Sequence, residues 1–130
     1  MTSALHNCIE AAMEIATDVL GGPVTYRRGT ATGTFDAIFA PKDYEATGQD
    51  GVIVTYHCHD VLIVASKLVL TPAATEGQPA PLPYQAQPTR GDTIPDASGQ
   101  VHEVLLIPNR NCYDSGFDDI HYRIHTKRIG

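Results

Sequence analysis

A chain of 130 residues, of which 42% are hydrophobic and 18% charged, is long enough to bury one core and too short for two. No stretch approaches the run of about 18 apolar residues that a membrane-spanning helix needs. The net charge of −6 argues against wrapping nucleic acid, because phosphate binding needs clustered Lys and Arg.

Residues 1–20 contain the one helix that the sequence predicts. Between Ser3 and Leu20 the apolar residues recur every three or four positions, which is the period of an amphipathic helix. Ser3 can cap the helix, and Gly21-Gly22-Pro23 ends it. The apolar positions are Leu5, Cys8, Ile9, Ala12, Ile15, Ala16 and Val19.

After this helix the apolar period changes to two, which is typical of β-strands. Val24–Arg28 and Thr32–Ala40 predict a first hairpin that turns at residues 29–31. Pro41 lacks a backbone donor, so we expect the second strand to end there. Residues 41–51 are polar and rich in turn residues, and they predict a loop.

A second hairpin is predicted from two runs of β-branched residues, Val52–Thr55 and Val61–Leu70. The stretch between them, YHCHD at residues 56–60, has the length and composition of a hairpin tip. Asp60 supports this interpretation, because Asp is common in turns and rare in strands.

The second half of the chain begins with a proline-rich segment at residues 71–90, which predicts an extended surface loop. Three strands follow, at Asp92–Ile94, Val101–Ile107 and Ile120–Thr126. The expected protein is therefore a single domain, residues 1–130, that is mainly β. The N-terminal helix precedes a small antiparallel β-barrel or sandwich with long loops, whose strands lie within 23–70 and 90–127.

Two histidine-rich stretches raise the hypothesis of a metal site, since imidazole and thiolate are good zinc ligands. Their spacing matches no standard zinc pattern, and in a strand Arg123 would lie between two of the histidines. The other interpretation is that Tyr122 and Ile124 face the core, while the histidines and Arg123 face water or a partner chain. We assign no metal ligand. The candidates are His57, Cys58, His59, His121 and His125.

No catalytic motif stands out, and we expect neither an enzyme nor a cofactor. There is no G-x-S-x-G, and Cys8 lies on the apolar stripe of the predicted helix. Asp114, Asp118 and Asp119 lack the spacing of a calcium loop. Arg90-Gly91-Asp92 is interpreted as a turn that leads into a strand.

Two other features bear on cellular location. The N-terminus lacks the basic patch and apolar run of a secretory signal, so we expect synthesis in a cytoplasm. The cysteines are three in number and widely spaced, which argues against a disulfide framework.

The segment PTRGDTIPDASGQVHEVLLI, residues 88–107, combines a basic residue, Gly-Asp-Thr, a turn ending in Gly and an alternating strand. It resembles the head–tail connector proteins of long-tailed bacteriophages, the head-completion or stopper proteins. The order of the upstream segments agrees: a helix, then VTYRRGTATGTFDAIFAPKDYE, then a loop into GVIVTYHCHDVLIVASKLVL. The resemblance covers most of the chain.

This resemblance implies a structural virion protein without catalytic activity. It implies a hexameric ring in the phage neck, with the portal or adaptor ring on one side and the tail-terminator or tail proteins on the other. Such a ring completes the head, closes the DNA channel and docks the tail. DNA would pass through the lumen without specific binding, with which the acidic composition is compatible. A tail-terminator or adaptor ring is the alternative, and a small metal-binding protein or enzyme is the alternative from another class.

The resemblance also implies functional residues. The channel loop of the family corresponds to Lys42–Gly51, which would place Asp43, Glu45 and Asp50 at the lumen, with Lys42 beside them and Tyr44 as a constriction. The remaining residues are expected to contact neighbouring rings, two from the hairpin tip and two from the basic tail. They are His57, His59, Lys127 and Arg128.

Overall fold

The computed structural model describes residues 8–10, 12, 21–108, 111–116 and 120–129. Most of the helix predicted for residues 1–20 lies outside these ranges; residues 8–10 and 12 are helical. Within the described part of the chain, no helix is long and apolar enough to cross a membrane.

The described residues are mainly β-structure, with one short 3-10 helix, η1 (Ala65–Lys67). The strands are β1 (Gly22–Arg28), β2 (Ala31–Thr47), β3 (Ile53–Val64), β4 (Val69–Leu70), β5 (Tyr84–Gln85), β6 (Thr93–Pro95), β7 (Val101–Val104), β8 (Tyr113–Gly116), β9 (His121–Ile124) and β10 (Thr126–Ile129).

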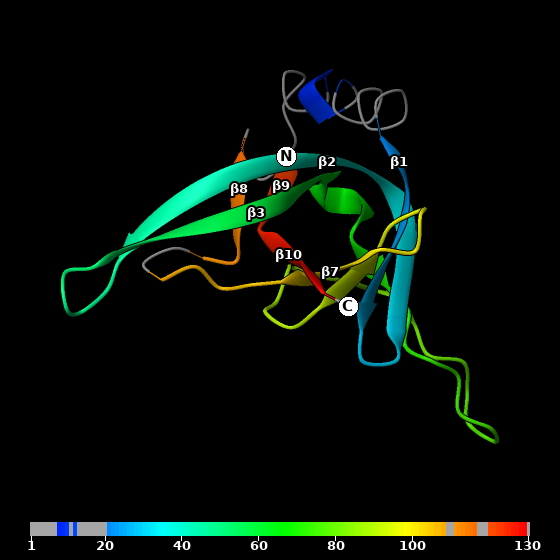
Figure 1. The fold of residues 1–130 in the computed structure, drawn as a ribbon. Coiled ribbons are helices and arrows are strands. Elements are labelled where there is room, and N and C mark those ends of the chain that lie inside the picture. The colour runs from blue at the N-terminus through cyan, green and yellow to red at the C-terminus, as the bar shows by residue number, and fades with distance from the viewer. Residues whose placement is uncertain (1–7, 11, 13–20, 109–110, 117–119, 130) are drawn as a thin grey trace.

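Eight of these strands form one antiparallel sheet in the order β10-β7-β6-β1-β2-β3-β9-β8, and β4 and β5 form a separate pair. The sheet curves strongly, so that β10 also lies beside β3 (Figure 1). There the Thr126 hydroxyl donates a hydrogen bond to the carbonyl oxygen of His59. No strand pairing in the described chain joins β10 to β8, so the sheet is not a closed barrel. Of the two predicted architectures, barrel and sandwich, the closed barrel is therefore wrong.

The curved sheet encloses the main hydrophobic core, to which β1, β3, β6, β7 and β9 all contribute. A smaller cluster lies where β2 and β3 leave the body: Tyr44, Ala46 and Cys58 pack there with Ile107. The largest fully buried apolar side chains are Tyr26, Val61, Ile63, Val64, Leu68, Leu70, Ile94, Ile107, Ile120 and Ile124.

Strand β2 is much longer than predicted, because Pro41 does not end it. β1 pairs with β2 only as far as Ala37, so β2 has an open edge at Pro41, where a missing donor is tolerated. The polar run that follows conceals an alternating pattern: Tyr44 and Ala46 are buried, whereas their neighbours are exposed. The loop predicted for residues 41–51 is therefore wrong except for its last residues.

The predicted hairpin tip at YHCHD is also wrong. Residues 56–60 lie in the middle of β3 and pair with β2, with Cys58 opposite Lys42 and Asp60 opposite Ala40. Asp60 is fully buried. A buried strand position accepts Asp only when partners satisfy its charge, and those partners come from distant parts of the sequence.

The two long strands β2 and β3 extend beyond the body as a two-stranded arm, comprising residues 40–59. In Figure 1 the arm projects to the left of the body. The chain turns at residues 48–52, where the Asp50 carboxylate accepts a hydrogen bond from the Val52 N–H at 3.0 Å.

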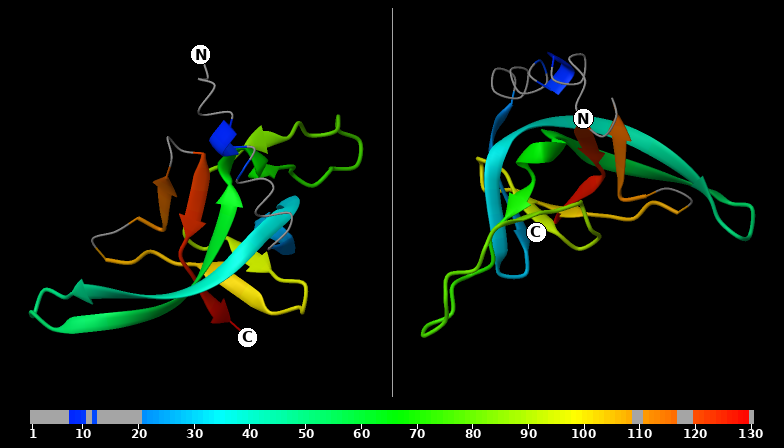
Figure 2. Two further views of the ribbon diagram at one scale, coloured as in Figure 1. Left: turned by 90° about the horizontal axis from the view of Figure 1, so that it is seen from above. Right: turned by 180° about the vertical axis from the view of Figure 1, so that it is seen from behind.

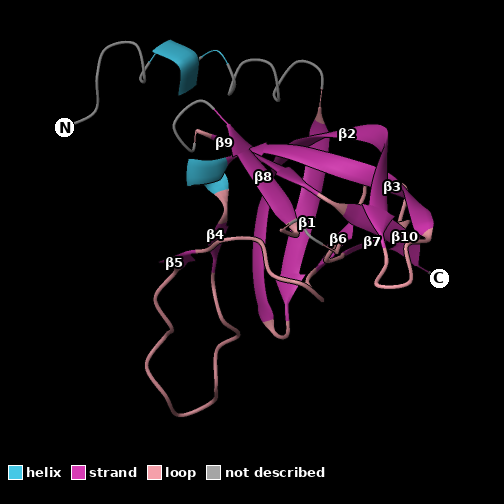
Figure 3. Ribbon diagram, turned by 90° about the vertical axis from the view of Figure 1, so that its left-hand side faces the viewer, coloured by secondary structure: helices cyan, strands magenta, loops and turns pink. Residues whose placement is uncertain are grey.

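The proline-rich segment forms a second projection, which we call the Pro-rich hairpin: residues 72–83, closed at their base by β4 and β5 (Figure 3). β4 crosses β2 at Gly33, where a Cβ atom would lie 2.2 Å from the Val69 carbonyl oxygen. Only glycine permits this approach. Residues 72–83 are exposed or half-buried, while Ala86 and Pro88 return to buried positions.

The last predicted strand, Ile120–Thr126, is divided in two at His125. The His125 N–H bonds to the Cys112 carbonyl at 2.9 Å, and its carbonyl accepts from the Leu105 N–H at 3.0 Å. These bonds redirect the chain from its place beside β3 to its place beside β7. Tyr122 and Ile124 face the core as expected.

Candidate functional site

The arm carries most of the residues predicted to face a channel, but it does not present them on one loop. Asp43 and Glu45 lie on the exposed face of β2, opposite His57 and Thr55 of β3. The Asp43 carboxylate accepts from His57 Nδ1 at 2.8 Å, and both side chains are largely exposed. Asp50 lies separately, in the turn at the tip. Whether these carboxylates face a lumen stays a prediction.

Tyr44 and Lys42 differ from the other predicted channel residues. Tyr44 is buried on the inner face of the arm, so within one chain it does not point outward as a constriction would. The Lys42 ammonium group lies 5.2 Å from the centroid of the Tyr44 ring, within the range of a cation–π contact.

The Tyr44 hydroxyl leads to a buried polar centre at the base of the arm. It donates a hydrogen bond to Asp60, which also accepts from Arg123 Nε at 2.6 Å. His125 Nδ1 lies 3.2 Å from Asp60 Oδ1 and donates to it, because an ionised carboxylate only accepts. On its other side, His125 Nε2 is 3.3 Å from an Asp114 carboxylate oxygen, without the geometry of a hydrogen bond.

These contacts set the protonation states at the centre. Burial by itself raises the pKa of Asp60, but hydrogen bonds from His125, Tyr44 and Arg123 outweigh it and hold that pKa below its ordinary value. Burial, together with the hydrogen bond to Asp60, raises the pKa of Tyr44 to about 12. The carboxylate is thus ionised and the phenol neutral over the physiological range. The buried polar centre therefore fixes the arm to Arg123 in β9 and to His125, the residue directly after β9.

A second buried carboxylate, Asp92, explains the Arg-Gly-Asp-Thr segment. Arg28 Nη2 lies 2.9 Å from Asp92 Oδ2, and the Tyr26 hydroxyl donates to the same oxygen. The Thr89 N–H donates to this oxygen at 3.1 Å, and Gly91 turns the chain with φ of 93°. The tripeptide is therefore a turn that leads into β6, as predicted, and its Asp92 connects this turn to β1.

The residues predicted to dock neighbouring rings lie on two faces. His59 and Arg128 are close enough that burial and the Arg128 charge lower the pKa of His59. The ring of His59 lies 5.9 Å from that of His102, whose Nε2 is 3.0 Å from Asp96. His57 lies farther out on the exposed face of the arm. Lys127 is on the opposite face of β10 from Arg128, with its ammonium group 3.9 Å from a Glu103 oxygen.

The histidines do not assemble as metal ligands. Cys58 points to the inner face of β3, whereas His57 and His59 lie on the other face. Within the described ranges, no three His, Cys, Asp or Glu side chains converge on one point. His125 is fully buried, so the expectation that it faces water or a partner is wrong. Sequence reasoning missed its role because Asp60 is 65 residues away along the chain.

Cys58 has no activating neighbour. Burial, and to a lesser extent the negative charges of Asp60 and Asp43, raise the pKa of its thiol to about 11. A thiol held in its protonated form is a poor nucleophile.

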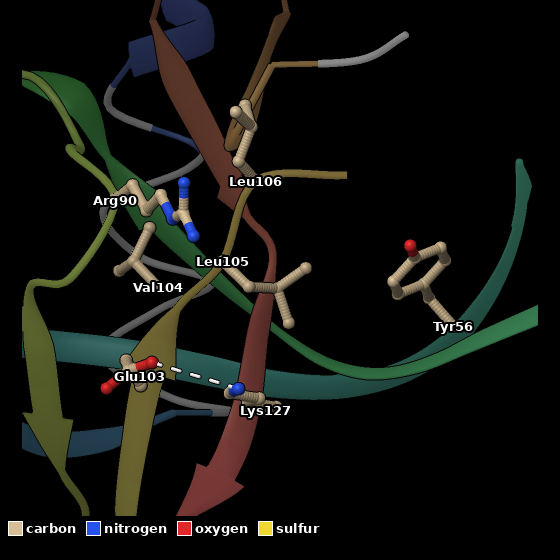
Figure 4. Close-up of a pocket in the computed structure, with 7 residues that line it drawn as sticks. All are labelled: Tyr56, Arg90, Glu103, Val104, Leu105, Leu106 and Lys127. Carbon is tan, nitrogen blue, oxygen red and sulfur yellow. Dashed lines mark ion pairs between the residues drawn. The ribbon is translucent and has the colours of Figure 1, made fainter. Parts of the chain in front are cut away.

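A pocket of about 190 Å³ lies where β7, β10 and the arm meet (Figure 4). Leu105 points toward Tyr56 across this pocket in Figure 4. The rim is charged, and the Arg90 guanidinium has no ion-pair partner among the described residues. The lining side chains that bear on the argument are Tyr56, Leu105, Leu106, Arg90, Glu103 and Lys127. No sequence motif marks this pocket, because its residues come from four separate segments.

Comparison with known proteins gives one match. A family model described as phage head-tail joining protein matches residues 2–130. No match was found among curated proteins or among solved structures. Because the match spans nearly the whole sequence, the chain belongs to the family of phage head-tail joining proteins, structural components of the virion neck.

Proposed function

We propose that this protein forms a ring between the portal complex and the tail, where it completes the head, closes the DNA channel and docks the tail. The observation that carries the proposal is the family match over residues 2–130. A head-tail joining protein must contact structures on both sides of the head–tail junction. A closed ring gives each copy the same contacts around a central channel. The ring we infer is hexameric, assembled from copies made in the bacterial cytoplasm.

The arm is the part of the chain that we assign to the channel. It is a projection whose exposed face carries Asp43 and Glu45, with Asp50 at its tip. Carboxylates repel DNA phosphates, so such a surface lets DNA pass without holding it. The buried centre at Asp60 and Arg123 supports this role, because it fixes the base of the arm to the body.

The surfaces assigned to neighbouring rings are the exposed positions of β10 and the outer side of β3. Lys127 and Arg128 add two positive charges to a chain that is acidic as a whole. His57 and His59 lie on one face of β3. Opposite charge on a tail-side partner would speed and orient docking.

The test is genetic and structural. A phage in which this gene is disrupted is expected to yield DNA-containing heads and separate tails, and a plasmid copy is expected to restore joined particles. Electron cryomicroscopy of the restored neck then locates the ring. Density between portal and tail supports a head-completion protein, whereas density only on isolated tails or only against the portal identifies a terminator or an adaptor. Joined, infectious particles without the protein would refute the proposal.

A further inference from the structure

Large apolar side chains are exposed mainly on the two projections of the molecule. Figure 2 shows that the arm and the Pro-rich hairpin extend from opposite sides of the body. Leu82, two residues before β5 on the returning side of the Pro-rich hairpin, is 83% exposed, the highest value among the large apolar residues described. The others are Val52, Ile53 and Val54 at the arm tip, Val69 and Tyr84 at the base of the hairpin, and Leu106 at the pocket.

The segment around Leu82 has the composition of a protein-binding segment. Pro79, Pro81 and Pro83 alternate with other residues, and residues 79–83 form neither helix nor strand. Prolines restrict this stretch to an extended conformation, so little conformational entropy is lost when it binds. Segments of this kind dock in grooves lined by aromatic side chains.

The pocket beside the arm has the size and lining for such a segment. Its volume of about 190 Å³ exceeds that of an engineered cavity of about 150 Å³ that holds a benzene molecule. Tyr56 supplies an aromatic wall, and Leu105 and the half-exposed Leu106 supply aliphatic surface. The chain's own Leu82 does not fill the pocket, because it is largely exposed on the hairpin.

The charges of the two surfaces also match. Glu76 is the one charged residue between Thr71 and Thr89, and it lies on the Pro-rich hairpin. The pocket rim has Arg90, which has no ion-pair partner within the described ranges, and also Lys127 and Glu103, whose opposite charges lie 3.9 Å apart, so the rim carries one net positive charge, that of Arg90. The attraction between Glu76 and the uncompensated Arg90 favours the approach of the hairpin to the rim in rate and orientation.

We propose that the Pro-rich hairpin of one copy inserts Leu82 into the pocket of the next copy. The proposal rests on the ring proposed above and names the contact that joins its subunits. Hairpin and pocket are different surfaces, so the contact is heterologous and repeats around a closed ring.

Disulfide trapping tests this contact. In a Cys8→Ser background, which removes the exposed native thiol, a chain carrying Leu82→Cys and Leu106→Cys is supplied to a phage that lacks its own copy. Oxidised necks are expected to give a ladder of covalent oligomers up to the full ring. The matched control, Val52→Cys with Leu106→Cys, places the thiol at the arm tip and is expected to give no ladder.

The two single-cysteine proteins distinguish the geometry of the contact. Mixed and oxidised, they should form dimers of Leu82→Cys with Leu106→Cys chains and nothing larger. Dimers of Leu82→Cys chains with each other would overturn the proposal, because they indicate a symmetric contact. Oligomers in the arm-tip control alone would identify the arm as the occupant, and cross-links to another virion protein would identify a different partner.

Self-association of the purified full chain gives an independent measurement. Leu82→Ser is expected to weaken the association measured by sedimentation about 10- to 100-fold, since one leucine loses its burial. Val52→Ser should leave the association unchanged. Rings that assemble with no 82–106 cross-link would refute this contact and leave the proposed function standing. Joined particles formed without any ring of this protein would refute both.

Discussion

Arg28 at the end of β1 binds Asp92 before β6, although 64 residues separate them in the sequence. The guanidinium reaches both carboxylate oxygens, at 3.1 and 2.9 Å. Asp92 is almost fully buried, so its charge depends on this pairing and on the Tyr26 hydroxyl. The contact connects the first hairpin to the return of the Pro-rich segment.

Asp92→Ala should therefore destabilise the protein by about 3 kcal/mol, because it leaves Arg28 and the Tyr26 hydroxyl without their common partner. The free energy of unfolding in urea measures the effect. Arg90→Ala, two residues away and exposed, is the matched control and should change stability by less than about 0.5 kcal/mol. Equal effects of the two substitutions would show that the buried carboxylate is not the determinant.

Alkaline pH should unfold the protein partly through Tyr44. Burial and Asp60 raise the pKa of Tyr44 to about 12 in the folded state, whereas the unfolded value is near 10. The contribution of the neutral Tyr44 phenol to the free energy of unfolding is fully present below pH 10. It is lost as pH rises toward 12, at up to about 1.4 kcal/mol per pH unit. Tyr44→Phe should be less stable at pH 8, through the lost hydrogen bond, and should lose stability less steeply above pH 10. Urea titrations at each pH test this, and parallel slopes would contradict it.

The crossing of β4 over β2 predicts contrasting effects at two glycines. Gly33→Ala places a methyl group against the Val69 carbonyl, so β4 must shift; we expect a loss of about 1–3 kcal/mol. Gly22→Ala, in the same sheet, meets no atom within 4 Å and should be close to neutral. Thermal unfolding of the two variants compares them directly. An unchanged thermal stability of Gly33→Ala would mean that β4, at the base of the Pro-rich hairpin, shifts at little energetic cost.

The exposed face of the arm supplies a prediction about DNA passage. Asp43→Lys with Glu45→Lys reverses both charges without touching the buried face, so the protein should fold. Where DNA would otherwise be repelled, the lysines should bind its phosphates and slow ejection, more strongly at low salt. Asp43→Asn with Glu45→Gln is the control and should have a smaller effect. Ejection kinetics equal to the wild type in the lysine variant would remove the arm from the channel.

The sequence predicted β1, β6 and β7 near their observed positions, because these strands follow the alternating pattern closely. It failed at the arm for two physical reasons. Pro41 lies at an open edge, where its missing donor costs little, and Asp60 lies in a strand because Arg123 and His125 satisfy its charge. Both depend on which strands become neighbours. That information is tertiary and is not present in any local window of the sequence.

The same limit applies to the candidate site. The sequence allowed the histidines of YHCHD to be metal ligands or part of a hairpin tip. Alternation along β3 instead places these histidines on one face of the strand and Cys58 on the other. The pocket could not be predicted, because Tyr56, Arg90 and Leu106 meet only after the sheet curves. The resemblance over residues 88–107 identified the family, and the structure shows that its Asp92 has a structural task.

The basic end of β10 yields the last prediction. Thr126 is fully buried and residues 126–129 pair with β7, so truncation here would remove a strand rather than a tail. Lys127→Ala with Arg128→Ala instead removes exposed charges and should keep stability within about 0.5 kcal/mol. If these residues dock a neighbouring ring, joining of filled heads to tails in extracts should fall at least about 10-fold, a loss of about 1.4 kcal/mol. Arg27→Ala, which removes an exposed cation on β1, is the control. Normal joining by the folded double variant would exclude β10 as a docking surface, since a surface that holds a partner by charge cannot lose both charges without weakening.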